Sequence, residues 1–225
     1  MTREKPVVTI SATYGTGSEA IGRSVADALD LPFLDRAIPA AVAAELLAAF
    51  DDVASLESHP AHGLGQWLTL FAPLGSAWLG VPEPQGPWRT EREYLDHTES
   101  VMRRAAGRGV VIMGRGASIV LGHHPGALHV RLDGPPERRL SQAIATGGLD
   151  PAAAVRAQRQ TDSARRHYVR HFYHLDVAAQ TLYHLSLDAT ALAPSTCVAL
   201  IVRAARDRAE SSPDSDSDAG GQGEQ

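Results

Sequence analysis

The apolar positions of the chain fall into short continuous runs and helical stripes that follow one another from the N-terminus. Val7–Ile10 is a β-branched run, which predicts a fully buried strand. Four apolar residues then recur at the spacing of one helix face: Ile21, Val25, Ala28 and Leu29. Leu31–Leu34 predicts a second short strand that ends at Asp35, and a helix is expected over about 39–50.

The same alternation continues in the second half of the chain. We expect a helix over about 89–107, a buried strand at Val110–Met113, a strand over about 127–132 and a helix from about 137. Asp150 and Pro151 are typical of a helix start, because aspartate caps a helix and proline suits its first turn. A strand near 184–188 and a last helix complete the pattern. Strands that alternate with helices predict an α/β fold, with a parallel sheet and helices on both faces.

Composition marks off two segments from this body. Residues 51–88 hold all three tryptophans and five of the fourteen prolines, so we expect short helical pieces and loops there. Residues 210–225 hold five acidic residues and no lysine or arginine, which predicts a disordered acidic tail. Without that tail the acidic residues balance the 21 basic ones, and the net charge of −5 comes from the tail alone. The charge balance therefore gives no reason to expect nucleic-acid binding.

The remaining composition is that of a globular protein, with 44% hydrophobic and 21% charged residues. No apolar run approaches the roughly 20 residues that span a bilayer, and the opening residues MTREKPVVTI lack the apolar core of a signal peptide. A single cysteine excludes an internal disulfide. We therefore expect a soluble cytoplasmic protein without a membrane partner.

The segment VVTISATYGTGSEAIG, residues 7–22, leads from a strand through glycines into a helix. Such a turn gathers backbone N–H groups at the positive end of a helix, which attracts phosphate. The P-loop pattern G-x-x-x-x-G-K-[ST] matches only at Gly17, because Ala12, Ser18 and Glu19 stand at its other fixed positions. The dinucleotide pattern fits better by spacing, through Gly15, Gly17 and Ala20, with Asp35 placed as a ribose acceptor. A purely structural turn is the third alternative.

Four blocks, in this order along the chain, extend the comparison beyond the glycine loop: VVTISATYGTGSEAIGRSVADAL with LPFLDR, then VIMGRGASIVL, VRLDGPPERRL, and DSARRHYVRHFY before YHLSLDAT. Through them the sequence resembles the cytidylate kinase-like family of P-loop proteins over residues 6–209. The resemblance implies a three-layer P-loop fold in residues 1–209, with a helical acceptor-side insert at 51–88 and a lid at 150–175.

The resemblance also implies a set of site residues. The phosphates of ATP would lie against Gly15, Thr16, Gly17 and Ser18, with Arg23 in place of the absent P-loop lysine. Asp35, Arg36 and Arg115 would contact the acceptor nucleotide. Lid residues would neutralise the transferred group: Arg159, Asp162, Arg165 and Arg166.

Each of these assignments has a plainer alternative. The four lid residues share one helix face, where Asp162 can orient a guanidinium, but such a face is also typical of solvated ion pairs. Arg115 can cap a helix, and Asp35 can be an N-cap. Arg138 and Arg139 open a helix that packs near the adenine in such kinases. The histidines lack a cysteine or carboxylate at ligand spacing, so we expect no metal ion held by the protein alone.

Two functions follow from these residues. In the first, the protein is a nucleoside monophosphate kinase that transfers the γ-phosphate of ATP, with Mg²⁺, to CMP or dCMP. In the second, the fold persists as a nucleotide-binding or regulatory module without catalysis, because the loop has no lysine and carries the additional carboxylate of Glu19. The dinucleotide-binding Rossmann protein is a third reading. The sequence does not indicate the oligomeric state.

Overall fold

A computed structural model describes residues 5–34, 91–114, 116–148 and 150–211. The helix expected at 39–50, the insert at 51–88 and residues 212–225 of the predicted tail lie outside these ranges. Asp35, Arg36 and Arg115 do so too.

A single five-stranded sheet forms the centre of the described structure. Its strands are β1 (Val7–Ala12), β2 (Phe33–Leu34), β3 (Val110–Met113), β4 (Ala127–Asp133) and β5 (Leu185–Asp188). They lie in the order β2-β3-β1-β4-β5, and every neighbouring pair is parallel. The predicted parallel sheet is therefore confirmed, and the strand at Val110–Met113 has the predicted bounds.

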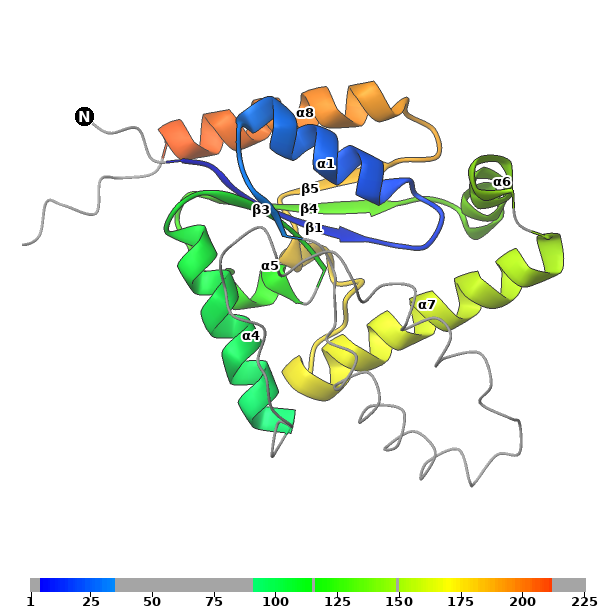
Figure 1. The fold of residues 1–225 in the computed structure, drawn as a ribbon, viewed down its shortest axis with the longest axis horizontal. Coiled ribbons are helices and arrows are strands. Elements are labelled where there is room, and N and C mark those ends of the chain that lie inside the picture. Colours follow the sequence, from blue (N-terminus) through cyan, green and yellow to red (C-terminus); the bar gives the residue numbers. More distant parts are fainter. Residues whose placement is uncertain (1–4, 35–90, 115, 149, 212–225) are drawn as a thin grey trace, which may run out of the picture.

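Helices cover both faces of this sheet (Figure 1). On one face lie α1 (Ser18–Leu29) and α8 (Pro194–Glu210), while α4 (Glu91–Ala106), α5 (Ala117–Val120) and α7 (Pro151–Tyr173) lie on the other. The helix α6 (Pro136–Gly147) stands at the end of the sheet, beside the turn between β1 and α1. The result is the expected three-layer α/β fold.

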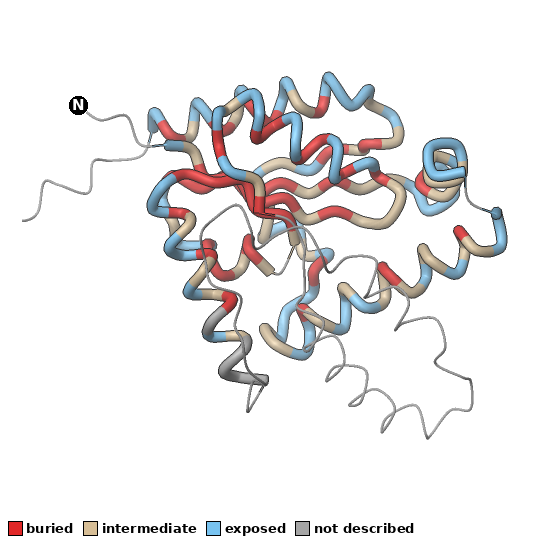
Figure 2. Tube along the Cα trace, viewed as in Figure 1, coloured by how far each residue is buried: buried red, intermediate tan, exposed pale blue. Residues whose placement is uncertain are grey.

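Alternate residues of the strands supply the cores of the two layers. Figure 2 shows that the central strands are buried between the helices. Val8 and Ile10 pack with Ile21 of α1 and Ile201 of α8, in the first layer. Val7 belongs to the second layer, with the core residues Val110, Ile112, Met102 and Ala117. Because both faces of the sheet are buried at its centre, the strand Val110–Met113 has the continuous apolar run from which it was predicted.

The strand order excludes the dinucleotide-binding alternative. In a Rossmann sheet the second strand lies directly beside the first. Here β3 lies between β1 and β2, so the end of β2 stands two strands away from the glycine loop. The spacing from Gly15 to Asp35 therefore does not have the meaning that it has in a dinucleotide site, and that interpretation was wrong.

The helix ends follow the local sequence. The Asp150 carboxylate accepts a hydrogen bond from the Ala153 amide at 3.0 Å, as the predicted N-cap of α7 requires. Two short elements were not predicted, α5 and the 3₁₀ turn η1 (Gln180–Leu182). The helix α8 continues to Glu210, the first residue of the predicted tail. Among the described residues, none of the helices combines the length and apolar character needed to cross a membrane.

Candidate functional site

Residues 13–17 form the turn from β1 to α1, and we call this segment the phosphate loop. Gly15 has φ +83°, and Gly17, with φ +64°, is the N-cap of α1, where no side chain caps the helix. The buried Thr16 hydroxyl donates to the Thr13 carbonyl across the loop at 2.8 Å. The amides of Gly15, Thr16 and Gly17 donate to no residue that the structure describes. Together with the positive end of α1, they form a concave site suited to a phosphate group.

Both peptide groups of Tyr14 are held by side chains from other helices. The Tyr14 amide donates to Asp162 Oδ1 at 2.9 Å, from α7. The Tyr14 carbonyl accepts from Arg139 Nη1 at 2.8 Å, from α6. Arg139 Nη1 also donates to Asp162 Oδ2 at 2.8 Å, so that the three residues form a closed ring of hydrogen bonds.

Gly15 lies directly against the backbone of Arg139. A Cβ atom at position 15 would stand 2.2 Å from the Arg139 carbonyl oxygen, far inside van der Waals contact. The left-handed φ of Gly15 and this close approach both require glycine. The phosphate loop therefore rests on α6 as well as on β1.

The first residue of the loop is held by the end of β4. The Thr13 hydroxyl donates to Asp133 Oδ1 at 2.8 Å, and Arg131 Nε donates to Asp133 Oδ2 at 3.0 Å. Partial burial opposes ionisation of Asp133, but the hydrogen bonds from Arg131 and Thr13 hold the pKa of its carboxyl below the usual value. Asp133 is therefore an ionised anchor for the loop.

Glu19 and Arg23 lie along the exposed surface of α1. Arg23 Nη2 is 3.1 Å from Glu19 Oε1, one helical turn away, and its guanidinium stands 5.2 Å from the centre of the Phe33 ring. Exposed pairs of this kind stabilise a helix by only a few tenths of a kcal/mol, so the pair can open at little cost. The phosphate-binding role of Arg23 remains a prediction.

The lid residues do not share one environment. Arg159 and Arg166 are exposed, whereas Arg165 is half-buried. Asp162 does orient a guanidinium, but that guanidinium belongs to Arg139 on α6 and not to a lid arginine. Arg138, the other arginine expected near the adenine, is exposed and pairs with Asp188 at 2.8 Å.

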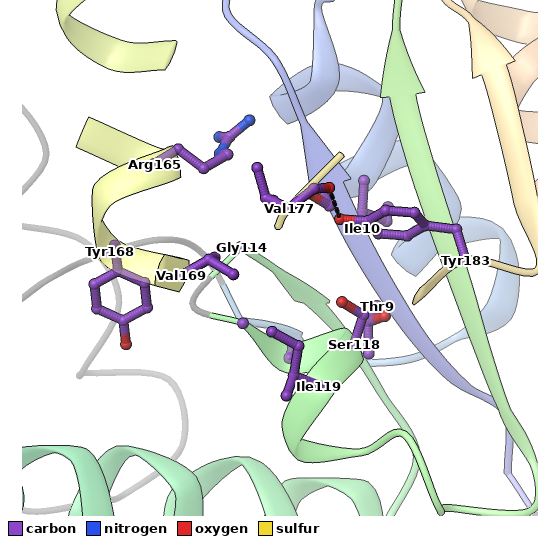
Figure 3. A pocket seen from close by; sticks show the side chains of 13 residues that line it. Thr9, Ile10, Gly114, Ser118, Ile119, Arg165, Tyr168, Val169, Val177 and Tyr183 are labelled. Carbon is purple, nitrogen blue, oxygen red and sulfur yellow. Dashed lines mark hydrogen bonds between the residues drawn. The ribbon is translucent and has the colours of Figure 1, made fainter. Parts of the chain in front are cut away.

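Arg165 lines a small cavity between α7, α5 and the ends of β1 and β3 (Figure 3). The cavity has a volume of about 30 Å³, enough for a water molecule or two and not for a nucleotide. Its polar lining comes from hydroxyl groups and the arginine: Thr9, Ser11, Ser118, Tyr168, Tyr183 and Arg165. Gly114 and Gly116, the neighbours of Arg115, also line it, so Arg165 and the segment around Arg115 meet at one place.

Two histidines pair at the opposite end of β4. The rings of His129 and His184 stack with centres 4.8 Å apart, and His129 Nδ1 lies 2.8 Å from the Thr9 hydroxyl. Burial, with smaller effects from His184 and Arg208, lowers the pKa of His129 to about 4. Within the described residues no three histidine, cysteine or acidic side chains are grouped so that they could hold a metal ion.

Sequence reasoning missed the anchoring residues Asp133 and Arg131, and it gave Arg139 a different role. One signal was available for Asp133, which follows a buried strand directly. The carboxyl ends of parallel strands meet at one edge of the sheet, where this residue lies beside the glycine loop. The ring through Tyr14 had no comparable signal, because it joins residues 125 and 148 positions apart.

Comparison with known proteins agrees with this architecture. The model of the cytidylate kinase-like family matches residues 7–191. The crystal structure of an uncharacterised protein from Eubacterium ventriosum has a TM-score of 0.61 at 15% identity and covers 90% of this chain and 99% of that one. At such low identity this likeness shows the fold alone. A gluconokinase from Sinorhizobium meliloti is more distant, with a TM-score of 0.48 at 17% identity, over 92% of this chain and 95% of that one. No protein with a curated description matches the chain.

Proposed function

The chain belongs to the cytidylate kinase-like family, and on this basis we propose that it is a nucleoside monophosphate kinase that transfers the γ-phosphate of ATP to CMP or dCMP. The observation that carries the proposal is the preordered phosphate loop. The amides of Gly15, Thr16 and Gly17 donate to no described residue, at the uncapped start of α1. Phosphoryl transfer depends on positioning and charge neutralisation, which such a loop provides for the donor.

The other roles in this proposal follow from the family resemblance. Gly15, Thr16, Gly17 and Ser18 bind the phosphates of ATP. Arg165 neutralises charge on the transferred group, and the exposed Arg159 and Arg166 add positive charge along the same helix. Residues 150–175 act as the lid. In this proposal the acceptor is held by Asp35, Arg36 and Arg115 and by the insert at 51–88.

Mg²⁺ would arrive with ATP and neutralise charge on its phosphates. Magnesium in such sites is bound through one or two protein ligands together with substrate phosphates, so it does not need a protein cage. Among the described residues, the Ser18 hydroxyl and the Glu19 carboxylate, in the first turn of α1, are oxygen groups that would suit it. When bound, the ion would offset the repulsion between the Glu19 carboxylate and the phosphates.

A second candidate function is a nucleotide-binding module without catalysis. The observation that favours it is the loop sequence, where the buried Ser18 stands in place of the P-loop lysine. The nearest basic residue on α1, Arg23, is paired with Glu19. In this case ATP binds and no phosphate is transferred.

A coupled assay of ADP release, run with each nucleoside monophosphate, separates the two. We expect turnover with CMP or dCMP that falls by at least about a hundredfold in Arg165→Ala and in Arg115→Ala, since each removes a cation from the reacting phosphates. Arg156→Ala, an exposed arginine on the same helix α7, is the matched control and should retain activity. Turnover in the native chain no greater than in Arg165→Ala contradicts the kinase proposal. ATP binding in calorimetry without turnover supports the second candidate.

A further inference from the structure

The ion pair between Asp162 and Arg139 is the most buried one that involves the phosphate loop. The Arg139 side chain is 6% exposed and the Asp162 side chain 12%. Arg139 Nε donates to the Gly134 carbonyl at 2.9 Å, and its Nη1 bonds Asp162 and Tyr14. The cost of burying two charges is recovered only when such hydrogen bonds are made, and removing one partner leaves the other uncompensated.

The position of this pair links two helices to the phosphate loop. Its two partners stand on α6 and α7, and the backbone that they both bond belongs to the phosphate loop. The pair fixes the peptide groups on both sides of Tyr14, immediately before Gly15. It therefore sets the direction in which the loop enters the left-handed turn at Gly15, and hence where the amides of residues 15–17 stand.

We propose that Asp162 and Arg139 form a clasp that positions the phosphate loop for nucleotide binding, and that Asp162 is a positioning residue of the lid helix and does not touch the transferred phosphate. The inference rests on the proposed function. In a loop without lysine, affinity for phosphate depends on backbone amides, and amides attract an anion strongly only when they are held in place beforehand. The clasp supplies that order from outside the loop.

The clasp also gives the Asp162 carboxylate a different role from that of the lid arginines on the same helix. Asp162 carries a negative charge, which would oppose a phosphate if it faced one. Its two oxygens are instead used by the Tyr14 amide and the Arg139 guanidinium. The charge of the Asp162 carboxylate is thereby compensated by Arg139, so that it does not oppose the binding of nucleotide by the lid arginines.

Three variants of the full chain test the clasp. Asp162→Ala removes both hydrogen bonds. Asp162→Asn keeps an oxygen for the Tyr14 amide and loses the charge that faces Arg139. Asp207→Ala is the control, because it breaks an exposed ion pair with Arg203 on α8, on the other face of the sheet. For each variant, hydrogen exchange is measured without nucleotide at the amides in and beside the loop that donate in the native chain, those of Thr13, Tyr14 and Ile21, and ATP with Mg²⁺ is titrated by calorimetry.

We expect Asp162→Ala to raise exchange in the loop about tenfold and to weaken ATP binding about tenfold, as loss of a hydrogen-bonded charge predicts. Asp162→Asn should fall between Asp162→Ala and the native chain in both measurements, and Asp207→Ala should change neither. If Asp162→Ala does not fold, Asp162→Asn carries the test, with about threefold weaker binding expected.

The outcomes distinguish the clasp from the proposed function. Loop exchange and ATP affinity that stay native in the Asp162 variants overturn the clasp, while ATP binding by the native chain leaves the proposed function standing. Faster loop exchange with native ATP affinity also overturns it, because the order of the loop then has no bearing on binding. If the native chain binds no ATP, the proposed function fails, and the role of the clasp in nucleotide binding fails with it.

Discussion

Replacement of Gly15 by alanine tests the packing of the phosphate loop on α6. The residue has φ +83°, and an added Cβ would meet the Arg139 carbonyl oxygen at 2.2 Å. Gly148 provides a matched control, because its φ is +60° and no atom of the described residues beyond its chain neighbours lies within 4 Å of its would-be Cβ. The two substitutions impose the same kind of backbone strain, and only the first adds an overlap with a backbone atom that cannot rotate away.

The expected costs follow from these distances. Left-handed backbone in alanine costs about 1–2 kcal/mol, part of which is offset because alanine is less flexible than glycine in the unfolded chain. Gly148→Ala should therefore lower the free energy of unfolding by about 1 kcal/mol. Gly15→Ala should cost about 1–3 kcal/mol more, the usual penalty for forcing an atom into a packed region.

Urea unfolding, followed by circular dichroism, measures both values in the same buffer. The m-value should stay constant, so that a shift in midpoint reports stability alone. Equal losses in the two variants, within about 0.5 kcal/mol, would refute the packing of the loop on Arg139, because strain alone would then explain both.

Two further predictions concern side chains away from the loop. The pKa of His129 is lowered from 6.5 to about 4 in the folded chain, so between these two pH values the unfolded chain binds more protons than the folded chain. The free energy of unfolding should therefore keep its full value above pH 6.5 and fall by up to about 3 kcal/mol as the pH drops towards 4. The pH dependence of the unfolding midpoint should be weaker in His129→Gln, which can still bond the Thr9 hydroxyl, and an unchanged slope would refute this origin. Cys197 is fully buried and burial raises the pKa of its thiol, so a thiol reagent should label the native chain at least about a hundredfold more slowly than the urea-unfolded chain. Equal labelling rates would show that the core of α8 is open.

Much of the fold could be predicted from the sequence, because its elements follow local rules. Val110–Met113 is a buried strand since four apolar residues lie between turn residues, and Asp150 begins α7 because its carboxylate caps the first turn. The short helix α5 was missed, since four residues are too few to show a helical period. The strand order was not predicted, and the glycine spacing favoured the Rossmann alternative, in which the second strand lies directly beside the first.

The candidate site was predictable only in part. The role of the loop glycines can be predicted from the local sequence, because they lie between a predicted strand and a predicted helix. The partners of the loop cannot be recognised in this way, because Arg139 and Asp162 are far from the loop in sequence and contact it only in the folded chain. The shared helix face suggested that Asp162 orients a guanidinium of its own helix, whereas in the structure it bonds Arg139, which only the packing of α6 on α7 shows. Helical spacing describes one helix and contains no information about a second.

Transfer of label from γ-labelled ATP to CMP tests the central claim most directly. The native chain is incubated with Mg²⁺, labelled ATP and CMP, and the nucleotides are separated. The account predicts that the label appears in CDP, at a rate reduced at least about a hundredfold in Arg165→Ala. Label that remains in ATP, or that appears only as inorganic phosphate with CMP and with dCMP alike, would contradict a nucleoside monophosphate kinase acting on cytidine nucleotides.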